Sequence, residues 1–183
     1  MSSTKHCKVI QGILLEELGR SNIQLGAELG VCRGLFTAWF AERFQGVHLF
    51  GVDAWGDGPG ITGRNRSGLS LDELERDARN LLAHVPNVSL IKGLTSQVHG
   101  IFADGIFDFI FVDACHSYEA VYDDFSCWHS KVRSGGLMLF HDYGGFGDRH
   151  GHFGVKKAID EIADIHGFEV HVDRASIAWI TIR

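Results

Sequence analysis

The sequence predicts an α/β fold: one doubly wound, mostly parallel sheet with helices on both faces and an antiparallel hairpin at the C-terminal end. Two observations lead to this prediction. Apolar runs of strand length alternate along the chain with longer segments whose apolar residues recur at helical spacing. The runs 107–112 and 137–140 are almost wholly apolar, which is typical of strands buried on both faces of a parallel sheet. The 183 residues show no repeat and no linker, so we expect a single domain over 1–183.

Each element has its own sequence signal. An opening helix over 9–18 ends at Gly19, a residue type that is common at helix C-termini. Ser70 and Glu73 have the spacing of a capping box, which predicts a helix that begins there and that Pro86 ends. The other predicted helices cover 34–44, 118–132 and 155–166. The predicted strands cover 23–29, 47–52, 88–91, 107–112, 137–140, 168–172 and 177–182, the last two as the hairpin.

Composition and charge narrow the range of partners. The formal net charge of −6 works against a nucleic-acid partner, because phosphate backbones are bound mainly by clustered Lys and Arg. No apolar run approaches the ~18 residues of a membrane span, so we expect no membrane contact. The four cysteines show no C-x-x-C spacing, and a chain of this size needs no disulfides, which favours free thiols in a reducing compartment. We therefore expect a soluble cytoplasmic protein.

The segment Glu28-Leu29-Gly30-Val31-Cys32-Arg33-Gly34 joins the first strand to its helix. Gly30 and Gly34 let the backbone approach a ligand, and the following helix offers the positive end of its dipole. Asp53 ends the second strand, where a carboxylate that accepts both ribose hydroxyls is expected. Trp55, two residues further on, is a candidate wall for the same ligand. Structural alternatives stay open: tight turns for the glycines, a cap for Asp53 and a core position for Trp55.

A second pair of motifs surrounds two acidic residues. Residues 107–118 are FDFIFVDACHSY, and residues 134–143 are SGGLMLFHDY. Asp113 and Asp142 follow the ends of two buried strands, so both side chains are expected at the ligand edge of the sheet. An imidazole has a pKa near ~6.5, which suits His116 for removing a hydroxyl proton at neutral pH. The alternatives are that the two acids cap loops and that His116 holds its loop by a backbone hydrogen bond.

These motifs together resemble a known family. Residues 28–34 resemble the cofactor loop of class I S-adenosylmethionine-dependent methyltransferases, and they lack the further glycines of nicotinamide enzymes. Segments 107–118 and 134–143 resemble the signatures of small bacterial O-methyltransferases, the group that includes macrocin-type sugar methyltransferases. The resemblance covers 27–159. It implies a Rossmann-like fold, S-adenosylmethionine as cofactor and methylation of a sugar-like hydroxyl on a small molecule.

The resemblance also implies roles for individual residues. The residues expected to bind the cofactor are Glu28, Gly30, Arg33, Gly34, Asp53, Trp55, Gly93, Leu94, Thr95 and Asp113. A divalent cation is expected on Asp113, His141 and Asp142, and His116 is expected to act as general base beside Asp113. Carboxylates favour Mg²⁺, whereas a histidine ligand shifts the preference toward Mn²⁺, Co²⁺ or Zn²⁺. A site without metal is the open alternative, since many class I methyltransferases have none.

Two other functions stay open beside methyl transfer to a small-molecule acceptor. One is a non-catalytic S-adenosylmethionine-binding or assembly subunit, and the more distant one is a nicotinamide oxidoreductase. The sequence shows no added substrate domain, so a homo-oligomer in which a neighbouring subunit closes the acceptor site is one expected arrangement. Two loops without a pattern, 56–69 and 144–154, follow strands and suit substrate contact. Their candidate residues are Arg64, Arg66, His150 and His152.

Overall fold

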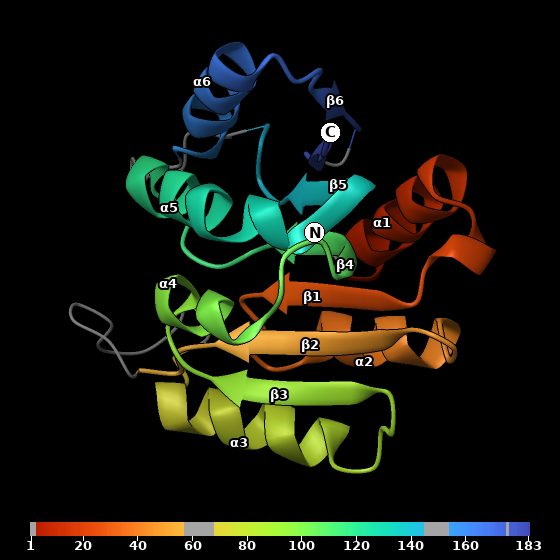
Figure 1. The fold of residues 1–183 in the computed structure, drawn as a ribbon. Helices are drawn as coiled ribbons and strands as arrows, with labels where there is room; N and C mark the ends of the chain where they lie inside the picture. The colour runs from red at the N-terminus through yellow and green to blue at the C-terminus, as the bar shows by residue number, and fades with distance from the viewer. Residues whose placement is uncertain (1–2, 57–67, 145–153, 175) are drawn as a thin grey trace.

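The computed structural model describes residues 3–56, 68–144, 154–174 and 176–183. Within these residues lies a seven-stranded sheet in the order β3-β2-β1-β4-β5-β7-β6 (Figure 1). The strands are β1 (Leu25–Leu29), β2 (His48–Asp53), β3 (Val88–Lys92), β4 (Phe107–Val112), β5 (Val132–Phe140), β6 (His171–Val172) and β7 (Ala178–Thr181). The helices are α1 (Ser3–Glu17), α2 (Leu35–Arg43), α3 (Leu71–Leu82), α4 (Thr95–Val98), α5 (Tyr118–Trp128) and α6 (Val155–His166). The predicted α/β fold is confirmed.

The strand order reverses at β1, which pairs with β2 on one side and β4 on the other. Strands β1 to β5 are mutually parallel, whereas β7 runs antiparallel to β5 and β6 antiparallel to β7. The arrowheads of β1, β2 and β3 all point to the left edge of the sheet in Figure 1. In doubly wound sheets, ligands bind outside the carboxyl ends of the strands, at the point where the strand order reverses. The fold therefore places a ligand site beside β1 and β4.

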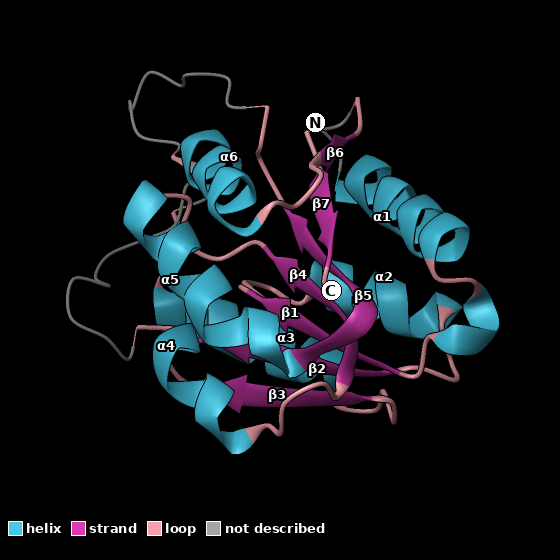
Figure 2. Cartoon of the chain, turned by 45° about the horizontal axis from the view of Figure 1, so that its top comes forward, coloured by secondary structure: helices cyan, strands magenta, loops and turns pink. Residues whose placement is uncertain are grey.

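Helices cover both faces of the sheet, with α5 and α6 on one side and α1 and α2 on the other (Figure 2). Alternate residues of β5 face two different cores, as expected for a strand buried on both sides. Met138 and Phe140 belong to the core under α5 and α6, whereas Leu137 and Leu139 belong to the core under α1 and α2. A third, smaller core surrounds Trp55 under α3. Within the described residues, none of these helices has the length and apolar character that crossing a lipid bilayer requires.

Several element boundaries differ from the sequence-based expectation. β5 begins at Val132, before the apolar run, because the residues that precede this run also pair with a neighbouring segment of the sheet. There Gly135 donates its N–H to the carbonyl of Ile182 at 2.7 Å, and Ile182 donates to Gly136 at 2.9 Å. α5 ends at Trp128, and residues 129–131 continue as a 3₁₀ turn. The short helix α4 was not predicted, since four residues contain too little periodicity for a helical signal.

Candidate functional site

The predicted site residues follow the carboxyl ends of the central strands, where backbone hydrogen bonds extend the sheet into the loops. Asp113 donates its N–H to the carbonyl of Leu29 at 2.8 Å, and His141 donates its own to the carbonyl of Val112 at 3.0 Å. Gly30 is tied to β2 in the same way. These bonds hold the first residue of each loop as firmly as a strand residue. The side chains that carry the chemistry are therefore fixed by the sheet.

The glycine loop, residues 30–34, packs directly against the loop after β4. Gly30 has a φ of +95°, and a Cβ there would lie 2.3 Å from the carbonyl oxygen of Asp113 and 2.7 Å from the Cα of Ala114. Gly34, with a φ of +76°, precedes α2 in the left-handed conformation. Only glycine adopts such backbone angles at low cost. Gly30 thus permits the close approach of the two loops, whereas Gly34 lies against Leu82 and Ala78 of α3.

Asp53, the last residue of β2, holds the glycine loop in place. Its Oδ2 accepts the N–H of Cys32 at 2.7 Å, and its Oδ1 accepts the N–H of Trp55 at 2.9 Å. Burial raises the pKa of Asp53, although these two hydrogen bonds favour the carboxylate. Each oxygen keeps further acceptor capacity for a hydroxyl. The indole of Trp55 is 2% exposed and donates to the carbonyl of Cys32 at 2.9 Å, so it is packed inside the protein beneath the loop.

Glu28 and Arg33 each interact with another side chain of the protein. Glu28 of β1 is 2% exposed and accepts a hydrogen bond from the Thr37 hydroxyl at 2.5 Å. Burial raises the pKa of Glu28 well above its ordinary value, which favours its neutral form. Arg33 is exposed and forms an ion pair with Asp77 of α3 at 3.0 Å. The two residues therefore brace opposite ends of the glycine loop.

The turn after β3 lies beside Asp53. Gly93 donates its N–H to the Asp53 carbonyl at 2.9 Å. Thr95 begins α4, and its carbonyl accepts the indole N–H of Trp128 at 3.1 Å. Burial raises the pKa of Asp124, an acid of α5 that is hydrogen-bonded to Thr95, to about 6. α5 thus fixes the turn that contains Gly93, Leu94 and Thr95, three of the residues expected to bind the cofactor.

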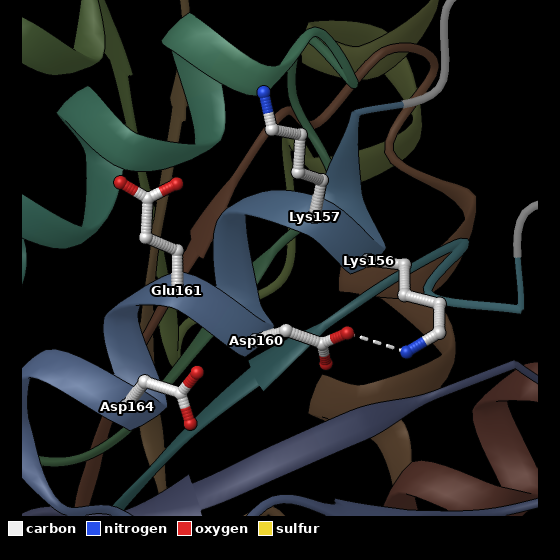
Figure 3. Close-up of a pocket in the computed structure, with 5 residues that line it drawn as sticks. All are labelled: Lys156, Lys157, Asp160, Glu161 and Asp164. Carbon is white, nitrogen blue, oxygen red and sulfur yellow. Dashed lines mark hydrogen bonds and ion pairs between the residues drawn. The ribbon is translucent and has the colours of Figure 1, made fainter.

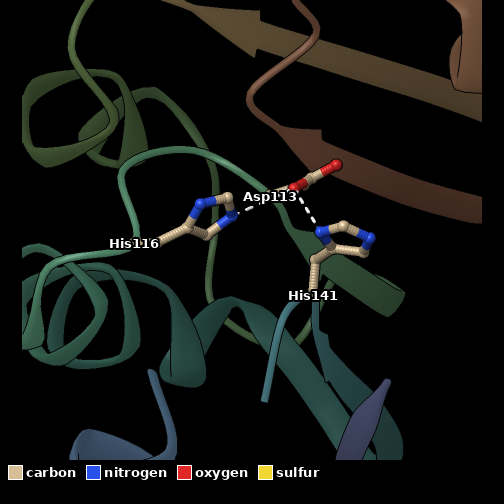
Figure 4. A group of neighbouring side chains, drawn as sticks. All are labelled: Asp113, His116 and His141. Atoms are coloured by element: carbon tan, nitrogen blue, oxygen red, sulfur yellow. Dashed lines mark hydrogen bonds and ion pairs between the residues drawn. The ribbon is translucent and has the colours of Figure 1, made fainter. Parts of the chain in front are cut away.

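The structure brings together the predicted catalytic and metal-binding residues after β4 and β5 (Figure 4). Asp113 Oδ1 lies 3.2 Å from His116 Nε2 and 3.0 Å from His141 Nδ1. One ligand atom from each of these three residues lies within 4.8 Å of the others, and we name the three residues the Asp113 cluster. The oxygens of Asp142 lie 3.4 Å from His141 Nδ1 and 3.9 Å from His116 Nδ1. His116 therefore stands among the predicted cation ligands.

Opposite charges compensate one another between the Asp113 cluster and Asp142. Burial disfavours the ionised form of Asp113, but its contacts with His116 and His141 outweigh burial and lower its pKa. Burial also disfavours a cationic His141, yet the neighbouring Asp113 and Asp142 raise its pKa to about 10. The contact with His141 lowers the pKa of Asp142. In the protein alone, His141 thus supplies positive charge between two carboxylates.

His141 Nδ1 is buried and has no well-aligned hydrogen bond, although it lies 3.0 Å from Asp113 Oδ1. The contact is an ion pair whose geometry does not satisfy the nitrogen. Two donor atoms that bind one octahedral ion at about 2.1 Å lie about 3.0 Å apart. The pair therefore fits a divalent cation. An imidazole beside two carboxylates favours Mn²⁺, Co²⁺ or Zn²⁺ over Mg²⁺.

α6 holds the loops that follow β4 and β5. Tyr118 donates its hydroxyl to Glu161 at 2.9 Å, and Tyr143 donates its hydroxyl to Asp160 at 2.6 Å. A surface pocket on the same helix is lined by Lys156, Lys157, Asp160, Glu161 and Asp164 (Figure 3). Its walls are charged side chains of one helix, and no residue of the Asp113 cluster contributes to it. The pocket is therefore separate from the candidate site.

One neighbour of the Asp113 cluster could not be predicted from the sequence. His6 of α1 lies against His141, with its Nδ1 3.2 Å from His141 Nε2. The two residues are 135 positions apart, so no local pattern could indicate the contact. The predicted substrate-contact residues that lie outside the described part of the chain are Arg64, Arg66, His150 and His152.

Solved structures share this fold over nearly the whole chain. A "putative caffeoyl-CoA O-methyltransferase" from Staphylococcus aureus has a TM-score of 0.72 and 15% identity, over 99% of this chain and 85% of that one. The cofactor-bound protein Rv0187 from MTB has a TM-score of 0.70 and 16% identity, over 100% and 81%. A TDP-rhamnose 3'-O-methyltransferase of calicheamicin biosynthesis has a TM-score of 0.67 and 13% identity, over 97% and 79%. These similarities confirm the fold.

The family follows from the sequence itself. No curated protein matches the chain. The family model described as "Methyltransferase domain" matches residues 27–143, which extend from β1 through the glycine loop and the Asp113 cluster to the residue after Asp142. The chain thus belongs to the methyltransferase-domain family and is a class I S-adenosylmethionine-dependent methyltransferase.

Proposed function

We propose that this enzyme transfers the methyl group of S-adenosylmethionine to a hydroxyl oxygen of a small, sugar-like acceptor at the Asp113 cluster. One observation carries the proposal: the glycine loop touches the cluster's own backbone, since a Cβ at Gly30 would lie 2.3 Å from the Asp113 carbonyl oxygen. A cofactor bound along the glycine loop would therefore end beside a base and two carboxylates. A TDP-rhamnose 3'-O-methyltransferase among the similar structures supports a sugar-like acceptor.

The proposed cofactor site begins at the glycine loop. Gly30 and Gly34 let the backbone lie close to the ligand. Asp53 accepts the ribose hydroxyls with the acceptor capacity that its two backbone hydrogen bonds leave over. The remaining residues assigned to this site are Gly93, Leu94 and Thr95 beside the adenine, Glu28, Arg33 and Trp55 bracing the loop, and Asp113 at the methyl end.

His116 is the proposed general base. In the tautomer whose Nε2–H donates to Asp113 Oδ1, at 3.2 Å, His116 Nδ1 carries the lone pair that takes the hydroxyl proton. The acceptor oxygen then attacks the methyl carbon in line with the sulfonium. The new O–C bond forms as the S–C bond breaks, which leaves S-adenosylhomocysteine, and the proton passes from His116 to solvent. Asp113 orients the imidazole and stabilises its cationic form.

Asp113, His141 and Asp142 are the proposed ligands of a divalent cation. When bound, such an ion supplies a positive charge that lowers the pKa of the acceptor hydroxyl and fixes the oxygen in place. The chain's contribution is the donor set: two carboxylates converge on a buried imidazole nitrogen at 3.0 and 3.4 Å. Mn²⁺, Co²⁺ or Zn²⁺ suits this set better than Mg²⁺.

The proposal also covers the domain organisation of the enzyme, its association and its cellular compartment. Residues 1–183 act as one methyltransferase domain, and copies of the chain associate so that a neighbour helps to close the acceptor site. The enzyme works in the cytoplasm. Four cysteines without the spacing of a redox or metal motif support this compartment.

Calorimetry followed by a methyl-transfer assay tests the proposed function. We expect S-adenosylmethionine and S-adenosylhomocysteine to bind and NAD to bind far more weakly. Labelled methyl groups should then appear on sugar hydroxyls within a panel that also contains catechols. Cofactor binding without product, under each of Mg²⁺, Mn²⁺, Co²⁺ and Zn²⁺, would favour the non-catalytic subunit. Equal or tighter binding of NAD would reject the cofactor assignment.

A further inference from the structure

His6 contacts the opposite ring nitrogen of His141 from the one that faces Asp113. Its Nδ1 is 3.2 Å from His141 Nε2, while the other nitrogen of His141 is 3.0 Å from Asp113 Oδ1. The rings of His6 and His141 meet edge to face, with centroids 4.7 Å apart and an interplanar angle of 78°. His141 is thus held between a carboxylate on one side and an imidazole on the other.

α1 fixes the position of His6. Cys7, Ile10 and Leu14 follow it on the helix and are 2%, 0% and 0% exposed, in the core that α1 shares with α2 and the sheet. A helix anchored in this way presents the partly buried His6 ring in one place. The contact with His141 therefore belongs to the packed fold.

The chemistry of two imidazoles determines the direction of this hydrogen bond. In an N···N contact, one nitrogen must donate a proton and the other must accept it. His141 Nδ1 can bind a cation only through its lone pair, so the ring proton of a neutral His141 must reside on Nε2. His6 Nδ1 is then the acceptor. A ligating histidine typically donates its other ring N–H to such a partner, which fixes the tautomer and the ring orientation.

We infer that His6 is a positioning residue of the cation site: by accepting the Nε2–H of His141, it holds the ring so that Nδ1 faces Asp113. This inference rests on the proposed function, because it assigns His141 to a cation. His6 touches neither Asp113 nor the acceptor in this role. It acts on the cation through the orientation of His141 alone.

Two substitutions separate the hydrogen bond from the ring packing. His6→Phe keeps an aromatic ring against His141 but has no acceptor, whereas His6→Asn loses the ring but places an amide oxygen near the position of Nδ1. Lys5→Ala, at an exposed neighbouring position on α1, is the matched control. Thermal unfolding of each variant shows that the helix remains packed.

The measurement is calorimetric titration of each folded variant with Co²⁺ alone, without cofactor or acceptor. We expect His6→Phe to weaken Co²⁺ binding about 10- to 100-fold, the usual effect of losing such a partner. His6→Asn should bind Co²⁺ much more tightly than His6→Phe, and Lys5→Ala should match the wild type. Equal Co²⁺ affinity in His6→Phe and the wild type would overturn the inference, as would equal losses in His6→Phe and His6→Asn.

Nitrogen NMR of the metal-free protein separates this inference from the proposed function. We expect the proton on His141 Nε2 to be protected from exchange in the wild type, and to lose that protection in His6→Phe. A wild type that binds no Co²⁺ but shows this pattern would contradict the proposed cation while supporting His6 as the residue that orients His141. An unprotonated His141 Nε2 in the wild type would overturn the role of His6 directly.

Discussion

The backbone of Gly30 lies directly against that of Asp113, so closely that a Cβ on Gly30 would be 2.3 Å from the Asp113 carbonyl oxygen. This contact joins the glycine loop to the Asp113 cluster. Because the two backbones are in direct contact, we expect a displacement of one loop to displace the other. The proposed site for the cofactor and the proposed site for the chemistry would then be mechanically coupled.

Gly30→Ala should disturb both sites at once. The substitution should cost about 1–3 kcal/mol for a positive φ and a similar amount for overpacking. Denaturant unfolding measures this loss, and calorimetry should show weaker binding of both S-adenosylmethionine and Co²⁺. Gly12→Ala in α1 is the control: nothing lies within 4 Å of its Cβ position, so it should raise stability by about 0.5–1 kcal/mol. A Gly30→Ala protein as stable as the wild type would contradict the coupling.

Asp53→Ala should weaken S-adenosylmethionine binding by about 1.5–3 kcal/mol, which is roughly ten- to a hundred-fold in Kd. The carboxylate would be lost both as acceptor for the ribose and as acceptor for Cys32 and Trp55. Asp53→Asn keeps one acceptor oxygen, so it should lose less affinity for S-adenosylmethionine than Asp53→Ala. Calorimetry gives both values, with Glu42→Gln, at a 73% exposed side chain, as control. Unchanged affinity in Asp53→Ala would remove Asp53 from the cofactor site.

His116→Ala should lower turnover about 10²- to 10⁴-fold, because the hydroxyl loses its proton acceptor. The affinity for S-adenosylmethionine should change little, since His116 is assigned no contact with the cofactor. Steady-state kinetics and calorimetry on the same preparation separate the two effects. His84→Ala, at an exposed histidine, is the matched control. Normal turnover at neutral pH would leave His116 with a structural role.

Asp142→Asn tests the cation with little disturbance of the backbone. Asp142 has a φ of +58°, a conformation that Asn tolerates well, so the fold should persist while one negative charge is lost. Cation affinity should fall by roughly an order of magnitude, because affinity follows the number of charged ligands. In the wild type, exhaustive chelation should abolish activity, and Mn²⁺, Co²⁺ or Zn²⁺ should restore it better than Mg²⁺. Full activity after chelation would reject the metal role and leave base catalysis alone.

Asp124 should make the stability of the protein depend on pH. Burial raises its pKa to about 6 in the folded protein, against about 3.9 in an unfolded chain. A raised carboxyl pKa stabilises the folded state fully below pH ~4, and this contribution is lost as the pH rises through ~6. At about 1.4 kcal/mol for each pKa unit, the loss is on the order of 3 kcal/mol.

Asp124→Asn should remove this dependence, because an amide does not titrate in this range. Urea unfolding at pH 4.5 and 7.5 should show that the variant gains stability relative to the wild type as the pH rises. Glu119→Gln, at an exposed residue of the same helix, should follow the wild-type curve. Parallel curves for Asp124→Asn and the wild type would show that Asp124 titrates normally.

Helices and strands whose sequence signal lies within the element itself were predicted from local patterns. The apolar run 107–112 coincides with β4. The capping box is present as predicted: Ser70 donates its N–H to Glu73 at 2.7 Å, and Glu73 donates its N–H to the Ser70 hydroxyl at 3.3 Å. The alternation of such elements was sufficient to predict a parallel, doubly wound sheet, because right-handed crossovers leave few topologies, but the order of its strands came from the structure.

Local patterns could not predict contacts between segments that are distant in the sequence. Residues 133–136 of β5 are polar or glycine, and their place in a strand depends on pairing with distant segments: Val132 with Phe107 of β4, and Gly135 and Gly136 with Ile182. His6 reaches His141 across 135 residues because of how α1 packs. The positions of Asp113 and Asp142 could be predicted from the ends of strands, but their roles came from resemblance to a family. Side-chain geometry was needed to add His116 to the same cluster.

α6 contributes no residue to the proposed site, yet it anchors both loops on its acceptor side through Tyr118 and Tyr143. Their partners, Glu161 and Asp160, are neighbours on one helix. Neither loop can open fully while α6 remains docked, and undocking of α6 releases both. We therefore expect the proposed acceptor side of the enzyme to open as one cooperative unit of local unfolding, with a free energy set by the packing of α6 on the sheet.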